Sequence, residues 1–173
     1  MPRIEVSGGA LERESRYVWG KRYLLTIVEE DLLPLVELSH QRLHLRVRLG
    51  TSPDKRQAIL DHWYRSQLRQ SVPAMIAKWE PLMGVSVSKF FVQRMKTKWG
   101  GCNHHAQTIR LNTDLAKKPK KCLEYIVAHE MVHLLEPTHN ARFQELMGSF
   151  VPRWKIHRDV LNALPVRHVD WTY

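Results

Sequence analysis

The sequence contains few of the features that define specialised classes of protein. Among its 173 residues, the two cysteines, Cys102 and Cys122, are too few for the disulfide framework of a small secreted scaffold. No apolar run approaches the roughly 20 residues of a membrane-spanning helix. No early stretch joins a basic start to an apolar segment and a cleavage site. We therefore expect a cytoplasmic protein that has no membrane partner.

The composition is typical of a chain that folds around a hydrophobic core. It is 43% hydrophobic and 25% charged, and it contains no internal repeat. Residues 1–16 have no apolar period, so we expect a flexible N-terminal arm there. A single domain is expected over residues 17–165, followed by a C-terminal tail over residues 166–173.

The first half of the chain contains both strand-like and helical patterns. Residues 23–28 and the alternating residues 43–49 predict strands, which we expect to pair in the antiparallel direction. A helix is expected from about residue 54 to residue 70. Pro73 is expected to kink it or to open a second helical segment, which should stop near Gly84.

The second half predicts a strand pair followed by helices. Residues 85–95 and 108–111 have strand character and are interpreted as a hairpin across a turn region at 99–103. A helical pattern covers residues 119–135, and Pro137 ends it. Two shorter helices are expected to begin near Asn140 and Pro152. Together these patterns predict an α+β fold.

The residues that indicate chemistry form the motif H-E-x-x-H at His129, Glu130 and His133. Four residues make slightly more than one helical turn, so both imidazoles lie on one face and can reach a single ion. Glu130 lies about 100 degrees around the helix, where it can contact a water on the metal. The rest of this helix is apolar and should be buried. Because buried polar groups without partners are costly, a metal site is the favoured interpretation.

A catalytic zinc ion commonly has three protein ligands and keeps one position open, so a third ligand is needed. His139 is the leading candidate because it lies six residues beyond His133, after Pro137 has ended the helix. The chain can therefore turn back toward the ion. Glu136 and Glu145 are the competing ligands.

The remaining cysteines and histidines do not indicate a closed structural zinc site. Cys102, His104, His105 and Cys122 lack the paired spacing that such sites favour. Both cysteines are interpreted as small buried residues, and the two histidines as exposed turn residues or neighbours of the active site.

Several segments resemble the YgjP-like predicted metal-dependent hydrolases, zincin-type domains related in motif to the SprT-like and WLM metalloproteases. The segments that carry the resemblance are Arg94–Cys102, Ile109–Asn112 and Tyr125–Leu134, followed by His139 and Phe143. In that family the first segment usually contains Arg-Trp-Gly-Ser-Cys, so Lys98 and Gly101 depart from the pattern.

The resemblance implies a zincin-like fold, in which a small antiparallel sheet packs on helices. It also implies a zinc-dependent peptidase with one Zn²⁺ ion held by His129, His133 and His139. Glu130 would act as general base toward a metal-activated water that attacks the peptide carbonyl. Nickel, cobalt or manganese can also occupy a three-histidine site.

In zincin folds an edge strand near the catalytic helix binds extended substrate by strand addition. By this resemblance, the candidates for substrate binding are Thr108, Ile109, Arg110 and Leu111. Such a site favours flexible or unfolded polypeptides. The donor that stabilises the oxyanion stays open among His104, His105 and Tyr125.

The net charge of +10 permits a second class of function. Such an excess attracts nucleic acid or acidic peptides in a salt-dependent way. The basic residues gather at Arg42, Arg46 and Arg48, at Arg94, Lys96 and Lys98, and at Lys117, Lys118, Lys120 and Lys121. The alternative functions are a nucleic-acid-binding module with a structural metal and a protease that acts on DNA-associated proteins.

Overall fold

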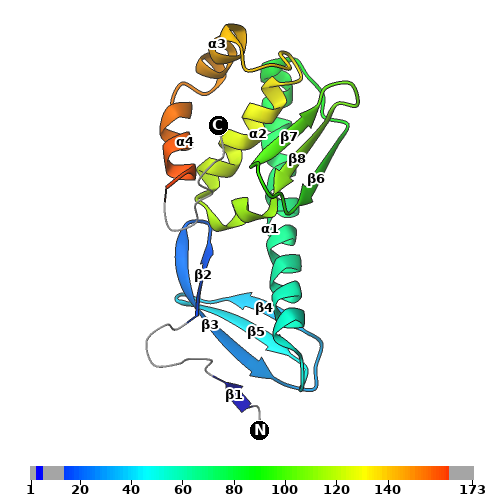
Figure 1. Ribbon diagram of the computed structural model, residues 1–173, viewed down its shortest axis with the longest axis vertical. Coiled ribbons are helices and arrows are strands. Elements are labelled where there is room, and N and C mark those ends of the chain that lie inside the picture. The colour runs from blue at the N-terminus through cyan, green and yellow to red at the C-terminus, as the bar shows by residue number, and fades with distance from the viewer. Residues whose placement is uncertain (1–2, 6–13, 164–173) are drawn as a thin grey trace.

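The computed structural model describes residues 3–5 and 14–163. Figure 1 shows a mixed sheet at one end, a second sheet with helices at the other, and one long helix, α1, that runs along both. The strands are β1 (Arg3–Glu5), β2 (Ser15–Val18), β3 (Lys21–Glu29), β4 (Leu35–Leu38), β5 (Arg42–Val47), β6 (Lys89–Gln93), β7 (Gly100–Asn103) and β8 (Thr108–Asn112). The helices are α1 (Pro53–Met83), the 3₁₀ helix η1 (Thr113–Lys117), α2 (Lys120–Val132), α3 (Ala141–Phe150) and α4 (Trp154–Leu161). The α+β class expected from the sequence is confirmed.

The first sheet has the order β1-β3-β5-β4, and β2 also pairs with β3. β3 and β5 run parallel, so the predicted antiparallel pairing of these two segments is wrong. The reason is β4, which the sequence analysis did not identify. β4 pairs antiparallel with the outer side of β5, and this places β5 beside β3 in the same direction. The inward side chains of this sheet form a core with α1, made of Leu25, Ile27, Leu43, Leu45, Val47 and Leu60.

Helix α1 is continuous through Pro73, where the sequence predicted a kink or a second segment. The side chain of Ser52 caps its start by accepting a hydrogen bond from the Lys55 amide at 3.3 Å. Gly84 ends it in the left-handed conformation, with φ of 68°, which glycine adopts without steric cost. At 1.5 Å per residue the helix is about 46 Å long, enough to cross both halves of the molecule.

The second sheet has the order β6-β8-β7, so β8 lies in the centre. β6 and β8 are parallel, whereas β7 and β8 form an antiparallel hairpin. The predicted hairpin of residues 85–95 with 108–111 is therefore wrong, because residues 100–103 of the supposed turn form the intervening strand. The expectation that residues 108–111 form an edge strand is also wrong, since β8 pairs on both sides. β7 and β8 contact α2, the helix that carries the motif.

The helices of the second half agree with the sequence analysis. α2 lies within the predicted residues 119–135, and α3 and α4 begin close to Asn140 and Pro152. These helices enclose a second and larger core with the C-terminal part of α1. No helix in the described part of the chain is both long and apolar enough to cross a membrane.

The predicted arm is described only in part. Arg3–Glu5 forms β1, which pairs with β3, and β2 begins at Ser15. The rest of the arm up to residue 13, and the predicted tail at residues 166–173, lie outside the described residues. The domain boundaries therefore stay a prediction.

Candidate metal centre

Helix α2 buries the polar residues of the motif. The exposed fractions are 3% for His129, 2% for Glu130 and 8% for His133. The helix is packed by the second sheet on one side and by α1, α3 and α4 on others, and its apolar residues fill the core between them. Polar side chains in such a place need partners.

The three histidines of the predicted ligand set converge through their Nε2 atoms. The Nε2 atom of His139 lies 3.1 Å from that of His129 and 3.0 Å from that of His133. Ligand nitrogens about 2.0–2.1 Å from a tetrahedral zinc ion are separated by about 3.3 Å, close to these distances. Among the described residues, only these three form a cluster with the geometry of a metal site. The structure therefore has a three-histidine metal site.

The protonation pattern of the rings also suits a cation. The Nδ1 atom of His133 lies 3.0 Å from the carbonyl oxygen of Glu136, so the N–H of the neutral ring is on Nδ1. Its Nε2 then presents a lone pair to the cluster, as in metal-ligating histidines whose other nitrogen donates to a carbonyl. Nε2 of His139 faces the Nε2 atoms of both His129 and His133. A single divalent ion can bind all three of these nitrogens.

Burial shifts the pKa values of His129 and His133 in the direction that metal binding needs. Burial, with contributions from His133 and His139, lowers the pKa of His129 to about 2. Burial also lowers the pKa of His133. Both rings are therefore neutral near pH 7 and their lone pairs are available. Burial raises the pKa of Glu130 to about 8, opposed by the positive charge of Lys98.

His139 is brought to the site by the segment that follows α2. This segment is exposed, and Asn140 ends it by accepting a hydrogen bond from the Phe143 amide at 3.0 Å, which starts α3. The ring of Phe143 then packs on the whole cluster, with centroid distances of 4.4 Å to His133, 4.8 Å to His129 and 5.0 Å to His139. The sequence analysis named Phe143 only as a position of the family resemblance.

The competing glutamates are not directed at the cluster. The side chain of Glu136 accepts a hydrogen bond from the Thr138 hydroxyl at 3.1 Å and lies 3.7 Å from the Arg142 guanidinium. Glu145 is exposed on α3. The structure thus brings His139, and neither glutamate, to the two helix histidines.

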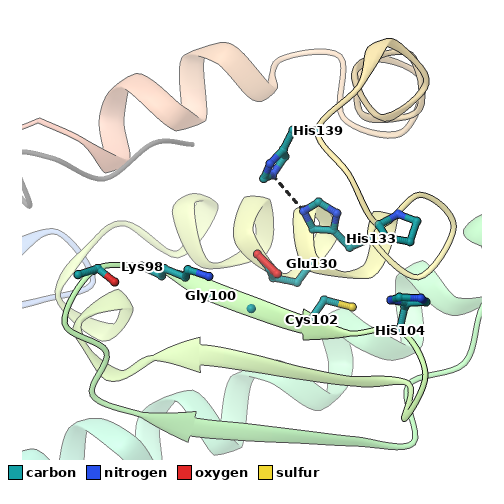
Figure 2. Close-up of a pocket in the computed structure, with 10 residues that line it drawn as sticks. Lys98, Gly100, Cys102, His104, Glu130, His133 and His139 are labelled. Carbon is teal, nitrogen blue, oxygen red and sulfur yellow. Dashed lines mark hydrogen bonds between the residues drawn. The ribbon is translucent and has the colours of Figure 1, made fainter.

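A cavity of about 390 Å³ opens beside the cluster (Figure 2). His133, His139 and Glu130 lie on one side, and β7 forms the opposite wall. The carboxylate of Glu130 lies 3.9 Å from Nε2 of His129, within the same small space. The lining residues that come from β7 and its two flanking segments are Thr97, Lys98, Gly100, Gly101, Cys102 and His104.

Gly100 allows β7 to lie directly against the metal helix. A β-carbon at this position would come within 3.0 Å of the Glu130 Cγ, the Ile126 Cγ2 and the Arg110 carbonyl oxygen. No larger residue fits without moving the strand or the helix. The family pattern includes this glycine. The structure gives the physical reason for it, which is the close packing of β7 on α2.

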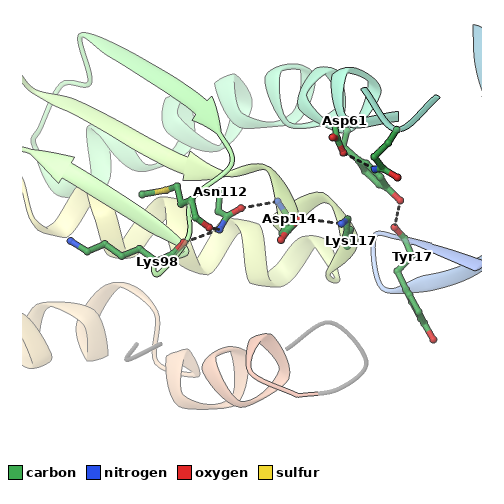
Figure 3. Close-up of polar contacts among 9 residues, drawn as sticks. Tyr17, Asp61, Lys98, Asn112, Asp114 and Lys117 are labelled. Atoms are coloured by element: carbon green, nitrogen blue, oxygen red, sulfur yellow. Dashed lines mark hydrogen bonds and ion pairs between the residues drawn. The ribbon is translucent and has the colours of Figure 1, made fainter. Parts of the chain in front are cut away.

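Asn112 holds the segment that carries Lys98 to the cavity. Its side-chain amide donates to the carbonyl oxygens of Lys98 at 2.8 Å and Met95 at 3.1 Å, and its Oδ1 accepts from the Asp114 amide (Figure 3). The same figure shows Asp114 paired with Lys117 in η1, at 3.0 Å. Sequence analysis found Asn112 only as a motif position, because these contacts join residues far apart in the chain.

The other histidines, the tyrosine and the cysteines considered in the sequence analysis lie at different distances from the cluster. His104 lines the cavity, and its ring lies against that of His105, with centroids 4.0 Å apart. Tyr125 is buried, with its ring edge-on to His129 at 5.8 Å. Cys102 is half-buried in the cavity wall, and Cys122 is buried elsewhere, so neither belongs to a cluster with metal-site geometry within the described residues.

The basic residues singled out in the sequence lie on different elements of the fold. Arg42 and Arg46 lie on β5, whereas Lys98 lies at the metal cavity in the other half of the molecule. Lys118 is only 4% exposed and donates a hydrogen bond to the Ala163 carbonyl oxygen at 2.6 Å. It therefore acts inside the fold and does not contribute to a charged surface.

The sequence resembles one family of known proteins, and part of the chain resembles a solved structure. The solved structures that are similar include the crystal structure of the metallopeptidase zymogen of Pyrococcus abyssi abylysin, with a TM-score of 0.47 and 20% identity over 51% of this chain and 89% of that chain. No curated protein matches the sequence. Residues 3–164 match a family model described as YgjP-like, metallopeptidase domain.

Proposed function

This chain belongs to the YgjP-like metallopeptidase family, and we propose that it hydrolyses peptide bonds in flexible or unfolded polypeptides with one Zn²⁺ ion held by His129, His133 and His139. The observation that supports this is the convergence of three Nε2 atoms beside a buried carboxylate in an open cavity. Three neutral histidines with an open position are the donor set of a catalytic zinc site. When bound, such an ion supplies a Lewis acid that polarises the scissile carbonyl and makes water a nucleophile near neutral pH.

Glu130 is the general base of this proposal. Its carboxylate accepts a proton from the attacking water and passes it to the leaving nitrogen, so that one water and one peptide bond give a carboxylic acid and an amine. The Glu130 carboxylate lies 3.9 Å from His129 Nε2, so it is close to the three histidine nitrogens but is not one of the candidate metal ligands. Burial raises the pKa of Glu130 to about 8, and two positive charges would favour the carboxylate that the base needs: the Lys98 side chain in the same cavity, and a divalent ion bound by the histidines.

The substrate is proposed to bind along β7. Among the described strands β7 pairs with β8, and Gly100, Gly101 and Cys102 line the cavity. An extended peptide that added to the edge of β7 facing away from β8, alongside Gly101 and Cys102, would run past the histidine cluster, with backbone hydrogen bonds that do not depend on sequence. We therefore propose that β7, and not residues 108–111, binds the substrate. His104 is the proposed oxyanion donor because it lines the same cavity.

The test of the proposed function is Glu130→Gln. The amide keeps the size of the side chain but cannot accept the proton, so turnover of an unfolded protein substrate should fall by about 10²–10⁴-fold. Metal content should be unchanged. Glu145→Gln on the exposed face of α3 makes the same change of charge and should leave turnover intact. Full turnover by the Glu130→Gln variant would remove Glu130 from the mechanism.

A further inference from the structure

A second cavity adjoins the histidine cluster on the side of α3 and α4. Its volume is about 320 Å³, and two of the candidate metal ligands, His129 and His139, form part of its wall. His139 also lines the cavity that contains Glu130, so the two cavities adjoin at this residue. We call the second one the α3–α4 pocket. The chemistry proposed above makes no use of it.

The wall of the α3–α4 pocket is mostly aromatic or apolar. Phe143 and Met147 are buried residues of α3, the ring of Tyr125 comes from α2, and Trp154 begins α4. Concave, largely apolar cavities of about 300–1,000 Å³ are typical of sites for small ligands, and this one is at the lower end of that range. Methionine adapts to guests of different shape because its side chain is unbranched and flexible. The pocket therefore suits one large apolar side chain.

The α3–α4 pocket also has one basic residue in its wall, Arg158. Its guanidinium carbon lies 5.3 Å from the centre of the Trp154 ring, over the ring face. Its ion-pair partner, Asp159, lies at 3.5 Å and has a side chain that is 73% exposed, so water screens this pair. A basic side chain that entered the pocket would leave water for an apolar site beside a like charge, and both changes are unfavourable.

We propose that the α3–α4 pocket selects the substrate residue next to the cleaved bond. It accepts a large uncharged apolar side chain, such as that of phenylalanine, leucine or methionine, and Arg158 rejects lysine and arginine. This inference rests on the peptidase function proposed above, because a peptide held at the histidine cluster delivers the side chain. Phe143, Met147 and Trp154 bury the guest, whereas the backbone of the same peptide lies along β7.

The first test compares peptides that differ only at a residue flanking the cleaved bond. The sites are first mapped by mass spectrometry on an unfolded protein cut by the intact, Zn²⁺-loaded enzyme. At one of the two flanking positions, phenylalanine should give a kcat/KM about tenfold or more above that of alanine. Gln144→Trp fills the pocket from an exposed position of its wall and should reduce this ratio to below about threefold. Ser149→Trp, at an exposed position of α3 outside the wall, is the matched control and should preserve the ratio.

The second test concerns the charge. In the wild type, the peptide with methionine at the selected position should be cut much faster than the peptide with lysine there. Arg158→Gln should raise kcat/KM for the lysine peptide relative to the methionine peptide about fivefold or more, because the like charge is removed. Arg153→Gln makes the same change at an exposed residue outside the wall and should change this ratio less than about twofold. Equal effects of the two substitutions would overturn the role of Arg158 in favour of the general positive field.

A binding measurement separates this proposal from the peptidase function. Phenylalanine hydroxamate and alanine hydroxamate carry the same metal-binding group and differ only in the side chain. In calorimetric titrations of the Zn²⁺-loaded protein, the phenylalanine compound should bind about tenfold more tightly. Gln144→Trp should abolish the difference, and Ser149→Trp should preserve it.

Each outcome has a distinct meaning. If no peptide is cut but the two hydroxamates differ as expected, the peptidase function fails and the pocket stands. If peptides are cut with no preference for phenylalanine over alanine at either flanking position, the pocket proposal is overturned and the peptidase function stands. Equal binding of the two hydroxamates, or a preference that survives Gln144→Trp, would also overturn the pocket proposal.

Discussion

Each imidazole of the metal centre is oriented by a different kind of contact. His133 is fixed by the carbonyl oxygen of Glu136, and Phe143 packs against all three rings. His129 is held by burial inside α2, whereas His139 lies on an exposed segment. The spacing of the motif predicted the shared face of the first two rings, because that relation depends only on helical geometry. The role of Phe143 depends on how α3 packs and has no signal in the spacing.

Replacement of His139 by alanine should release the metal. Loss of an outer partner of a ligand typically costs 10–100-fold in metal affinity, so loss of a ligand should cost more than about 100-fold. Elemental analysis after dialysis against a competing chelator measures the retained metal. His104→Ala, which removes a histidine of the same cavity outside the cluster, should retain it. Full retention in His139→Ala would assign the third ligand to another group, with Glu136 the nearest candidate.

Lys118 should make the stability of the fold depend on pH in the alkaline range. Burial lowers its pKa below the ordinary value of 10.5. Between the lowered value and 10.5, the unfolded chain binds more protons than the folded chain, so the contribution of Lys118 to stability rises with pH there. Urea unfolding of the wild type and of Lys118→Met should show this rise as an increase with pH in the stability of the wild type relative to the variant. A difference that stays constant up to pH 10.5 would contradict the expected shift.

At the scale of elements, β7 contacts α2, and residues of both elements line the cavity beside the histidine cluster. The sequence predicted α2 well because its apolar pattern and Pro137 are local signals. It did not predict that β3 and β5, or β6 and β8, run parallel. Strand direction is determined by partners distant in sequence, and the short strands β4 and β7 that fix it here have little alternation to detect.

Gly100→Ala should disturb the contact of β7 with α2. The added methyl would lie 3.0 Å from atoms of Ile126, Glu130 and Arg110, and overpacking of this kind typically costs about 1–3 kcal/mol. Thermal unfolding should reveal the loss of stability, and turnover should fall because Glu130 is displaced. Gly101→Ala is the matched control for thermal unfolding, since its methyl would meet only the Met95 Cε at 3.9 Å. Equal losses of stability in the two variants would mean that the close packing of β7 on α2 at Gly100 does not limit the size of the side chain there.

At the scale of the whole molecule, α1 joins two hydrophobic cores. Leu60 belongs to the core of the first sheet, while Tyr64, Leu68 and Val72 belong to the core beneath the metal helix. The Tyr64 hydroxyl also donates a hydrogen bond to the Tyr17 carbonyl oxygen at 2.9 Å, which ties β2 to the helix (Figure 3). Composition predicted a chain able to bury a core but did not indicate that the core has two parts.

Leu60→Ala should weaken the first core more than the second. Removal of a buried leucine typically costs about 2–5 kcal/mol. Hydrogen exchange measured by mass spectrometry should show the largest loss of protection in β3 and β5, with a smaller loss in α2. Leu82→Ala, at a position of α1 that is 60% exposed, should leave both regions protected. Equal loss of protection in α2 and β5 would show that the two cores unfold as one unit.

The unequal burial of the three imidazoles bears on how fast an ion enters and leaves. His129 lies within α2 and His133 is the residue that caps its C-terminal end, and both side chains are buried in the core. His139 lies on the exposed segment between Pro137 and Asn140, which can move away while α2 stays folded. Exchange of the ion with solution should therefore be faster than global unfolding, and its rate should follow the local opening of this short segment.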